Sequence, residues 1–73
     1  MNRRERFEKV AAKRVDKILD TLKLLGNCSN PNNYEYTEKD VELMFSEIRN
    51  AVKLASVRFE SEVTKKKTKK FKF

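Results

Sequence analysis

Residues 26–33 read GNCSNPNN, and this run of turn-forming residues decides the fold because it separates two segments with a helical pattern. A proline disfavours helix at the residue before it, and asparagine and serine favour turns. Glycine is the commonest residue directly after a helix. The sequence therefore predicts an Asn-rich loop over residues 26–36, with Gly26 ending the helix before it.

Upstream of this loop, apolar residues recur at helical spacing. At about 100° per residue they share one side of a helix: Phe7, Ala11, Val15, Ile18, Leu22 and Leu25. Asn2 is a suitable N-cap for such a helix. We therefore predict an amphipathic helix over residues 3–25.

Downstream of the loop, residues 37–40 read TEKD, a variant of the capping box with Asp at its fourth position. The helix that it opens runs to about residue 63. Its main apolar face comprises Val41, Met44, Phe45, Ile48, Val52, Ala55 and Phe59. A second row, interrupted by Glu47, holds Leu43, Asn50, Leu54 and Val57. Two rows are more than packing against one helix requires.

The expected fold class is therefore all-α. Residues 1–64 form a two-helix hairpin domain, and residues 65–73 form a disordered lysine-rich tail, since its like charges repel. A chain of 73 residues buries little core of its own. We therefore expect a homodimer, with Asn50 in the second row able to fix the register of a helix pair.

Composition argues against an enzyme. The chain has no histidine, one cysteine and one glycine, so the usual Cys/His metal sites and Gly-rich phosphate loops are not expected. Cys28 has no nearby base, and we predict no catalytic residue, cofactor or metal. The sequence shows no secretory signal and no apolar run of about 20 residues. A lone cysteine fits a reducing compartment, so we expect a cytoplasmic protein.

Charge is distributed unevenly along the chain. Residues 1–25 hold eight Lys or Arg against four Asp or Glu, and residues 26–64 hold four against seven. Residues 65–73 add six lysines and no acid, which brings the total to +7. Such an asymmetry shapes the encounter with partners, and it favours a polyanion.

One face of the first predicted helix carries a line of cations, Arg3, Arg6, Lys9, Lys13 and Lys17, which we name the basic ridge. Arg14 lies between this ridge and the apolar face. At 1.5 Å per residue the ridge is about 20 Å long and suits a phosphate backbone. The alternative is a solvated face with local pairing such as Glu5 to Lys9.

The C-terminal residues interleave lysines with aromatic rings. The candidate nucleic-acid contacts here are Lys65, Lys66, Lys67, Lys69, Lys70, Phe71, Lys72 and Phe73. Lysines that meet phosphates and phenylalanines that stack on bases suit single-stranded nucleic acid. An anionic membrane surface or a purely solubilising tail are the alternatives.

The leading hypothesis is a small accessory protein that binds DNA or RNA through sequence-independent phosphate contacts. A second hypothesis is a protein–protein module, such as an inhibitor of a host nucleoprotein. Its anchors would be Tyr34, Tyr36, Leu43, Asn50, Leu54 and Val57. A third is a small component of a ribonucleoprotein particle.

Residues 24–30, LLGNCSN, followed by NYEYT at 33–37, carry a resemblance. Over residues 6 to 59 the chain resembles short, uncharacterised helical proteins of Gram-positive plasmids, phages and conjugative elements. The resemblance implies two helices joined by an Asn-rich turn and an accessory role in a mobile element. It carries no catalytic or binding residue across.

Overall fold

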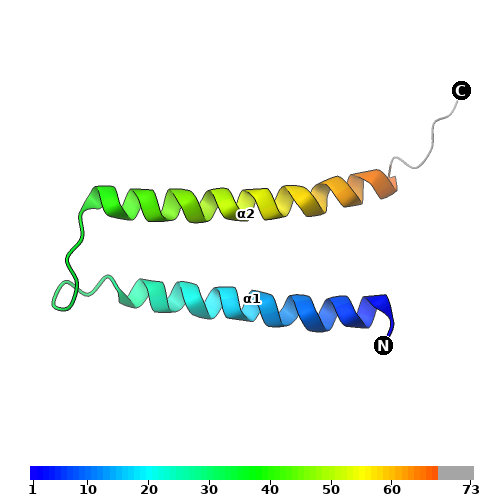
Figure 1. The fold of residues 1–73 in the computed structure, drawn as a ribbon, viewed down its shortest axis with the longest axis horizontal. Helices are drawn as coiled ribbons and strands as arrows, with labels where there is room; N and C mark the ends of the chain where they lie inside the picture. Colours follow the sequence, from blue (N-terminus) through cyan, green and yellow to red (C-terminus); the bar gives the residue numbers. More distant parts are fainter. Residues whose placement is uncertain (68–73) are drawn as a thin grey trace, which may run out of the picture. The chain divides into compact units, whose positions relative to one another are not determined.

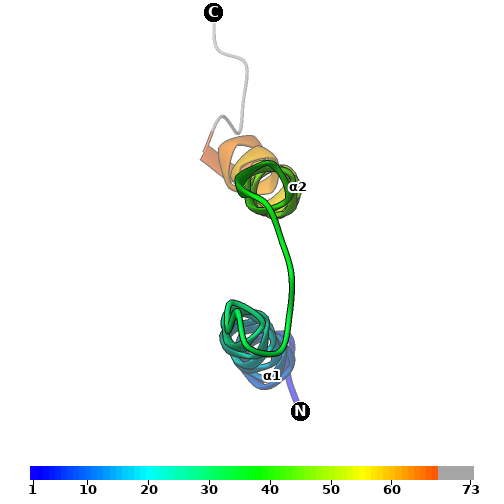
Figure 2. The same cartoon turned by 90° about the vertical axis from the view of Figure 1, so that its left-hand side faces the viewer.

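The computed structural model describes residues 1–67, which form two α-helices, α1 (Arg3–Asn27) and α2 (Glu38–Lys67) (Figure 1). No strand occurs in this part of the chain. The predicted all-α, two-helix class is therefore confirmed. Contacts divide the chain into two units, Met1–Glu35 with α1 and Tyr36–Phe73 with α2. Figure 2 gives a second view of both helices, with the loop that joins them facing the viewer.

Asn2 caps α1 as the sequence predicts. Its backbone is extended, and its side-chain Oδ1 accepts a hydrogen bond from the Glu5 N–H at 2.8 Å. This bond satisfies one of the backbone donors that a helix N-terminus leaves unpaired. Asn2 Nδ2 in turn donates to Glu5 Oε1 at 2.8 Å, so the cap fixes the first turn on which the ridge begins.

The predicted C-terminal end of α1 is wrong by two residues. Gly26 lies inside the helix without a positive φ, and Asn27 is its last residue. The helix ends instead at Cys28, whose N–H donates to the Leu25 carbonyl at 2.9 Å, while the Ser29 N–H donates to the Gly26 carbonyl at 3.1 Å. These bonds form while Cys28 keeps a right-handed backbone conformation. No residue with a left-handed conformation is needed, so the helix can end without a glycine.

This geometry makes replacement of Gly26 by alanine a stabilising change. A Cβ at Gly26 meets nothing within 4 Å, and a helical glycine costs about 0.5 kcal/mol or more relative to alanine. We expect Gly26→Ala to raise the midpoint of thermal unfolding measured by circular dichroism. A lower midpoint would mean that residue 26 needs a left-handed conformation and would contradict the helical end described above.

The loop after α1 is organised by Asn30. Its carbonyl accepts hydrogen bonds from the N–H groups of Asn33 and Tyr34, both at 3.1 Å, and its side-chain Oδ1 accepts from the Asn32 N–H at 3.0 Å. The last contact is an Asx turn, a local structure that asparagine forms readily. The turn predicted at Asn30-Pro31 is therefore present, although helix α1 takes the first two residues of the expected loop.

Helix α2 begins with the predicted capping box. Thr37 Oγ1 accepts from the Asp40 N–H at 3.1 Å, and Asp40 Oδ2 accepts from the Thr37 N–H at 2.9 Å. The reciprocal bonds show that the shorter Asp side chain reaches back as well as the usual Glu does. Thr37 thus sets where α2 starts, and with it the phase of the faces along the helix.

The predicted end of α2 at residue 63 is also wrong, because the helix continues to Lys67. The expectation of disorder therefore fails for residues 65–67, while residues 68–73 of the predicted tail lie outside the described part. Lysine is a good helix former, and cations are favourable at a helix C-terminus. Lys65 Nζ also lies 3.5 Å from Glu62 Oε1. These local terms support one further turn despite the repulsion between lysines.

Within its own unit, each helix leaves its large apolar side chains exposed. Phe7, Ile18 and Leu22 of α1 are 47%, 56% and 37% exposed, and Phe59 of α2 is 62% exposed. The least exposed residues of the described chain all belong to the predicted apolar faces: Ala11, Leu25, Val41 and Ile48. The helices are thus amphipathic rods whose polar faces remain open to solvent.

Candidate nucleic-acid interface

The basic ridge lies on α1 as the sequence predicts. Arg3, Arg6, Lys9, Lys13 and Lys17 are all helical and exposed. Separations of three and four residues place successive side chains on the same side of the helix. Because α1 is uninterrupted from Arg3 to Asn27, the ridge is a continuous row about 20 Å long at 1.5 Å per residue.

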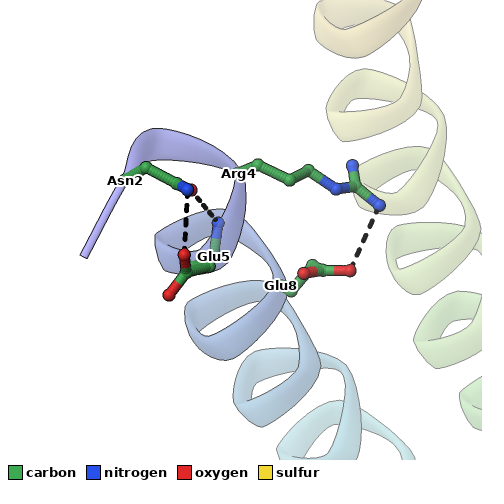
Figure 3. A network of polar contacts seen from close by, with 4 residues as sticks. All are labelled: Asn2, Arg4, Glu5 and Glu8. Carbon is green, nitrogen blue, oxygen red and sulfur yellow. Dashed lines mark hydrogen bonds and ion pairs between the residues drawn. The ribbon is translucent and has the colours of Figure 1, made fainter.

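Acidic side chains near the start of α1 have partners outside the ridge. Glu5 accepts from Asn2 Nδ2, as described above, and Glu8 Oε2 lies 3.4 Å from Arg4 Nη2 (Figure 3). Arg4 also places its guanidinium 5.7 Å from the centre of the Phe7 ring, which directs it toward the apolar side of the helix. Exposed pairs of this kind add little stability, but they decide where the two carboxylates point.

The ridge cations consequently keep their charge available. Glu5 does not pair with Lys9, and no ion pair joins any ridge residue to an acid among residues 1–67. Lys9, Lys13 and Lys17 follow one another at four-residue spacing, so neighbouring ammonium groups repel. A bound anion would relieve that repulsion, whereas local pairing does not do so in this structure.

Arg14 is exposed on the same helix, between the ridge and the apolar face, as predicted. Its side chain also takes part in no ion pair within the described residues. Arg14 therefore widens the cationic surface at its centre without lying on the row itself.

The sequence contains a feature that predicts the contact between Glu5 and Asn2, although the prediction of the ridge did not use it. Asn2 and Glu5 stand three residues apart, which is the separation of a capping box. In the structure the Glu5 side chain turns back to this cap, so the acid four residues before Lys9 is engaged elsewhere. Asn2 and Arg4 thereby act on the site indirectly, because they hold Glu5 and Glu8 away from the ridge.

The C-terminal lysines are placed only in part. Lys65 lies in the last turns of α2, with its side chain 70% exposed and paired with Glu62. Lys66 and Lys67 also belong to the helix. The remaining candidates lie outside the described residues: Lys69, Lys70, Phe71, Lys72 and Phe73.

The candidate protein-binding residues are exposed. Tyr34 and Tyr36 are 53% and 44% exposed, and Leu43, Leu54 and Val57 on α2 are 60%, 61% and 46% exposed. Asn50 is exposed as well. The α2 residues share one side of that helix, whereas Tyr34 belongs to the unit that contains α1.

No group of three or more His, Cys, Asp or Glu residues gathers to hold an ion within residues 1–67. The exposed Cys28 lies with its Sγ 3.8 Å from the Leu24 carbonyl oxygen, a weak contact that closes the helix end. Neither described helix is apolar enough over a sufficient length to cross a bilayer.

Comparisons with known proteins give no matching family model, no similar curated protein and no similar solved structure. The functional assignment therefore rests on the residues of this chain.

Proposed function

We propose that the protein is a small nucleic-acid-binding accessory protein that holds phosphate backbones with little regard to base sequence. The observation that supports this proposal most is the basic ridge, whose five cations are exposed and free of ion pairs within residues 1–67. If this side of the helix were only a solvated face with local ion pairs, Glu5 and Glu8 would pair with the ridge cations. Those acids are engaged by Asn2 and Arg4 instead.

The chemistry of the ridge favours phosphate over other anions. A continuous row of point charges repeated every three or four residues suits a polymer with regularly spaced charges better than a single small anion. Lysine binds phosphate as a point charge, and contacts to phosphates fix position without specifying sequence. The ligand class is therefore DNA or RNA, bound through its backbone.

Counterion release supplies the affinity in this proposal. Each phosphate neutralised by a cation frees condensed ions from the nucleic acid. The ridge supplies five such contacts, and the six lysines of residues 65–73 add more. The resemblance described above suggests an accessory protein of a plasmid, phage or conjugative element, and the lone cysteine suggests that it acts in the cytoplasm.

A titration of the full chain against labelled duplex DNA at several salt concentrations tests this proposal. Five ridge contacts alone give a slope near −4.5 in the plot of log affinity against log salt, or about 500-fold weaker binding at 200 mM than at 50 mM. Two duplexes of unrelated sequence should bind within a factor of about three of each other. Binding that ignores salt, or no binding at all, would disprove the proposal.

The exposed loop tyrosines favour a second candidate, a protein–protein module. Aromatic residues are common anchors at interfaces, and Tyr34 and Tyr36 remain half exposed on either side of Glu35. An inhibitor directed at a host nucleoprotein, or a component of a ribonucleoprotein particle, would use them. Such a module would bind its protein partner and leave free nucleic acid unbound in the titration above.

A further inference from the structure

The side of α2 that bears Leu54 and Val57 also carries polar and charged residues at the same helical spacing as the apolar row. Ser61 also lies on this side, and because the helix continues to Lys67, Lys65 joins it. We name the whole set the α2 seam: Glu47, Asn50, Leu54, Val57, Ser61 and Lys65. Steps of three and four residues keep these positions on one side of the helix. Lys53 and Glu60 lie together along one flank.

The charges on this seam have a direction. Glu47 stands toward the N-terminal end and Lys65 toward the C-terminal end, while on the flank Lys53 precedes Glu60. An identical helix running the opposite way presents the reverse order. We propose that the α2 seam binds the α2 seam of a second copy of this chain in antiparallel orientation, forming a two-fold symmetric dimer.

One register satisfies all of these positions together. Leu54 meets Val57 of the second copy, Asn50 meets Ser61, Lys53 meets Glu60, and Glu47 meets Lys65. In each of the four pairs, the midpoint between the two residue numbers lies within about half a residue of Ser56. This scatter is less than about 1 Å along the helix axis. Two-fold symmetry makes each contact occur twice. In an antiparallel helix pair, a flank of one helix lies beside the same flank of the second copy. Lys53 of one copy can therefore reach Glu60 of the other.

A parallel pair of the same helices is disfavoured by charge. Equal positions would then meet, so Glu47 would face Glu47 of the second copy at the N-terminal end of the seam. On the flanks, Lys53 would lie beside Arg58 of the second copy. Like charges in these positions are repulsive. The antiparallel arrangement replaces each repulsion with an attraction or a hydrogen-bonding pair.

The side chains that this dimer uses are available. Within residues 1–67, no ion pair or side-chain hydrogen bond engages Glu47, Asn50 or Lys53. Glu60 Oε1 has only a 3.5 Å contact from the Ser56 hydroxyl. Lys65 pairs with Glu62 at 3.5 Å, but both side chains are about 70% exposed, and such a pair adds little stability and is readily exchanged.

Two leucines on α2 provide a matched test. Leu54 and Leu43 are 61% and 60% exposed, but Leu54 lies next to the symmetry axis, whereas Leu43 precedes Glu47 and belongs to none of the four pairs. By sedimentation equilibrium of the full chain, Leu54→Ala should raise the dimer dissociation constant about 100-fold, tenfold for each copy. Leu43→Ala should change it less than about threefold. Circular dichroism verifies that both variants stay helical.

Equal effects of the two leucines would overturn the proposed register, and a wild-type chain that stays monomeric at millimolar concentration would overturn the dimer. Charge exchange tests the orientation separately. Lys53→Glu should weaken the dimer because the new carboxylate repels Glu60 of the second copy. Lys53→Glu combined with Glu60→Lys should restore the dimer because the pair is again of opposite charge. Failure of the double variant to recover the wild-type constant would overturn the antiparallel pairing.

Discussion

Replacing Lys9, Lys13 and Lys17 together with alanine is expected to weaken binding to duplex DNA about 500-fold at 0.1 M salt. Each phosphate contact contributes about 0.9 to the slope of log affinity against log salt. Three lost contacts therefore lower the slope by about 2.7, which at 0.1 M corresponds to a loss of about 2.7 log units in affinity. Alanine is the best helix former, so α1 should remain helical. Fluorescence anisotropy with a labelled duplex measures both quantities.

A matched control removes the same charge elsewhere. The variant Lys23→Ala, Lys39→Ala, Arg49→Ala also loses three cations, so both triple variants fall from the wild-type net charge of +7 to +4. None of these three residues lies on the ridge. We expect the control to lose less than about tenfold in affinity. Equal losses in the two variants would mean that total charge, and not the ridge, determines binding.

Helix starts could be predicted from the sequence because their determinants are local. Asn2 and Thr37 each meet a backbone N–H three residues ahead, so residue type and spacing suffice. The apolar faces of both helices follow from periodicity in the same way. The all-α class and the phase of each helix therefore needed no long-range information.

Helix ends were less predictable, because several endings are nearly equal in free energy. Gly26 can either stop a helix or continue it, and the choice depends on where the N–H groups of Cys28 and Ser29 find acceptors. At the end of α2, repulsion between lysines competes with the Lys65–Glu62 pair and with the helix dipole. A sequence pattern does not resolve such small and opposing free-energy contributions, so the predicted C-terminal ends of α1 and α2 were both too early.

The composition of the ridge was visible in the sequence, but the availability of its charges was not. The spacing allows Glu5 to pair with either Asn2 or Lys9, and only side-chain geometry decides between them. The structure selects Asn2. The same holds on α2, where the extension to Lys67 brings Lys65 into a seam that otherwise appears as a short apolar row.

Deleting residues 65–73 is expected to have the largest effect on affinity. The deletion removes six lysines and takes the net charge from +7 to +1. If all six meet phosphates, the salt slope on duplex DNA falls by about 5.4, and the affinity at 0.1 M salt falls by about five orders of magnitude. The remaining ridge should still bind weakly, with a slope near −4.5. A deletion variant with wild-type affinity would assign binding to α1 alone.

The phenylalanines in this segment separate charge from stacking. Phe71→Ser with Phe73→Ser keeps all six lysines, so duplex affinity and its salt slope should stay within about twofold of the wild type. Binding to single-stranded DNA should weaken by about 1–3 kcal/mol for each ring that stacks on a base. The ratio of the two affinities, measured at one salt concentration, isolates the contribution of stacking because the electrostatic contribution is common to wild type and variant. An unchanged ratio would mean that the rings do not stack, and that the segment acts through its lysines alone.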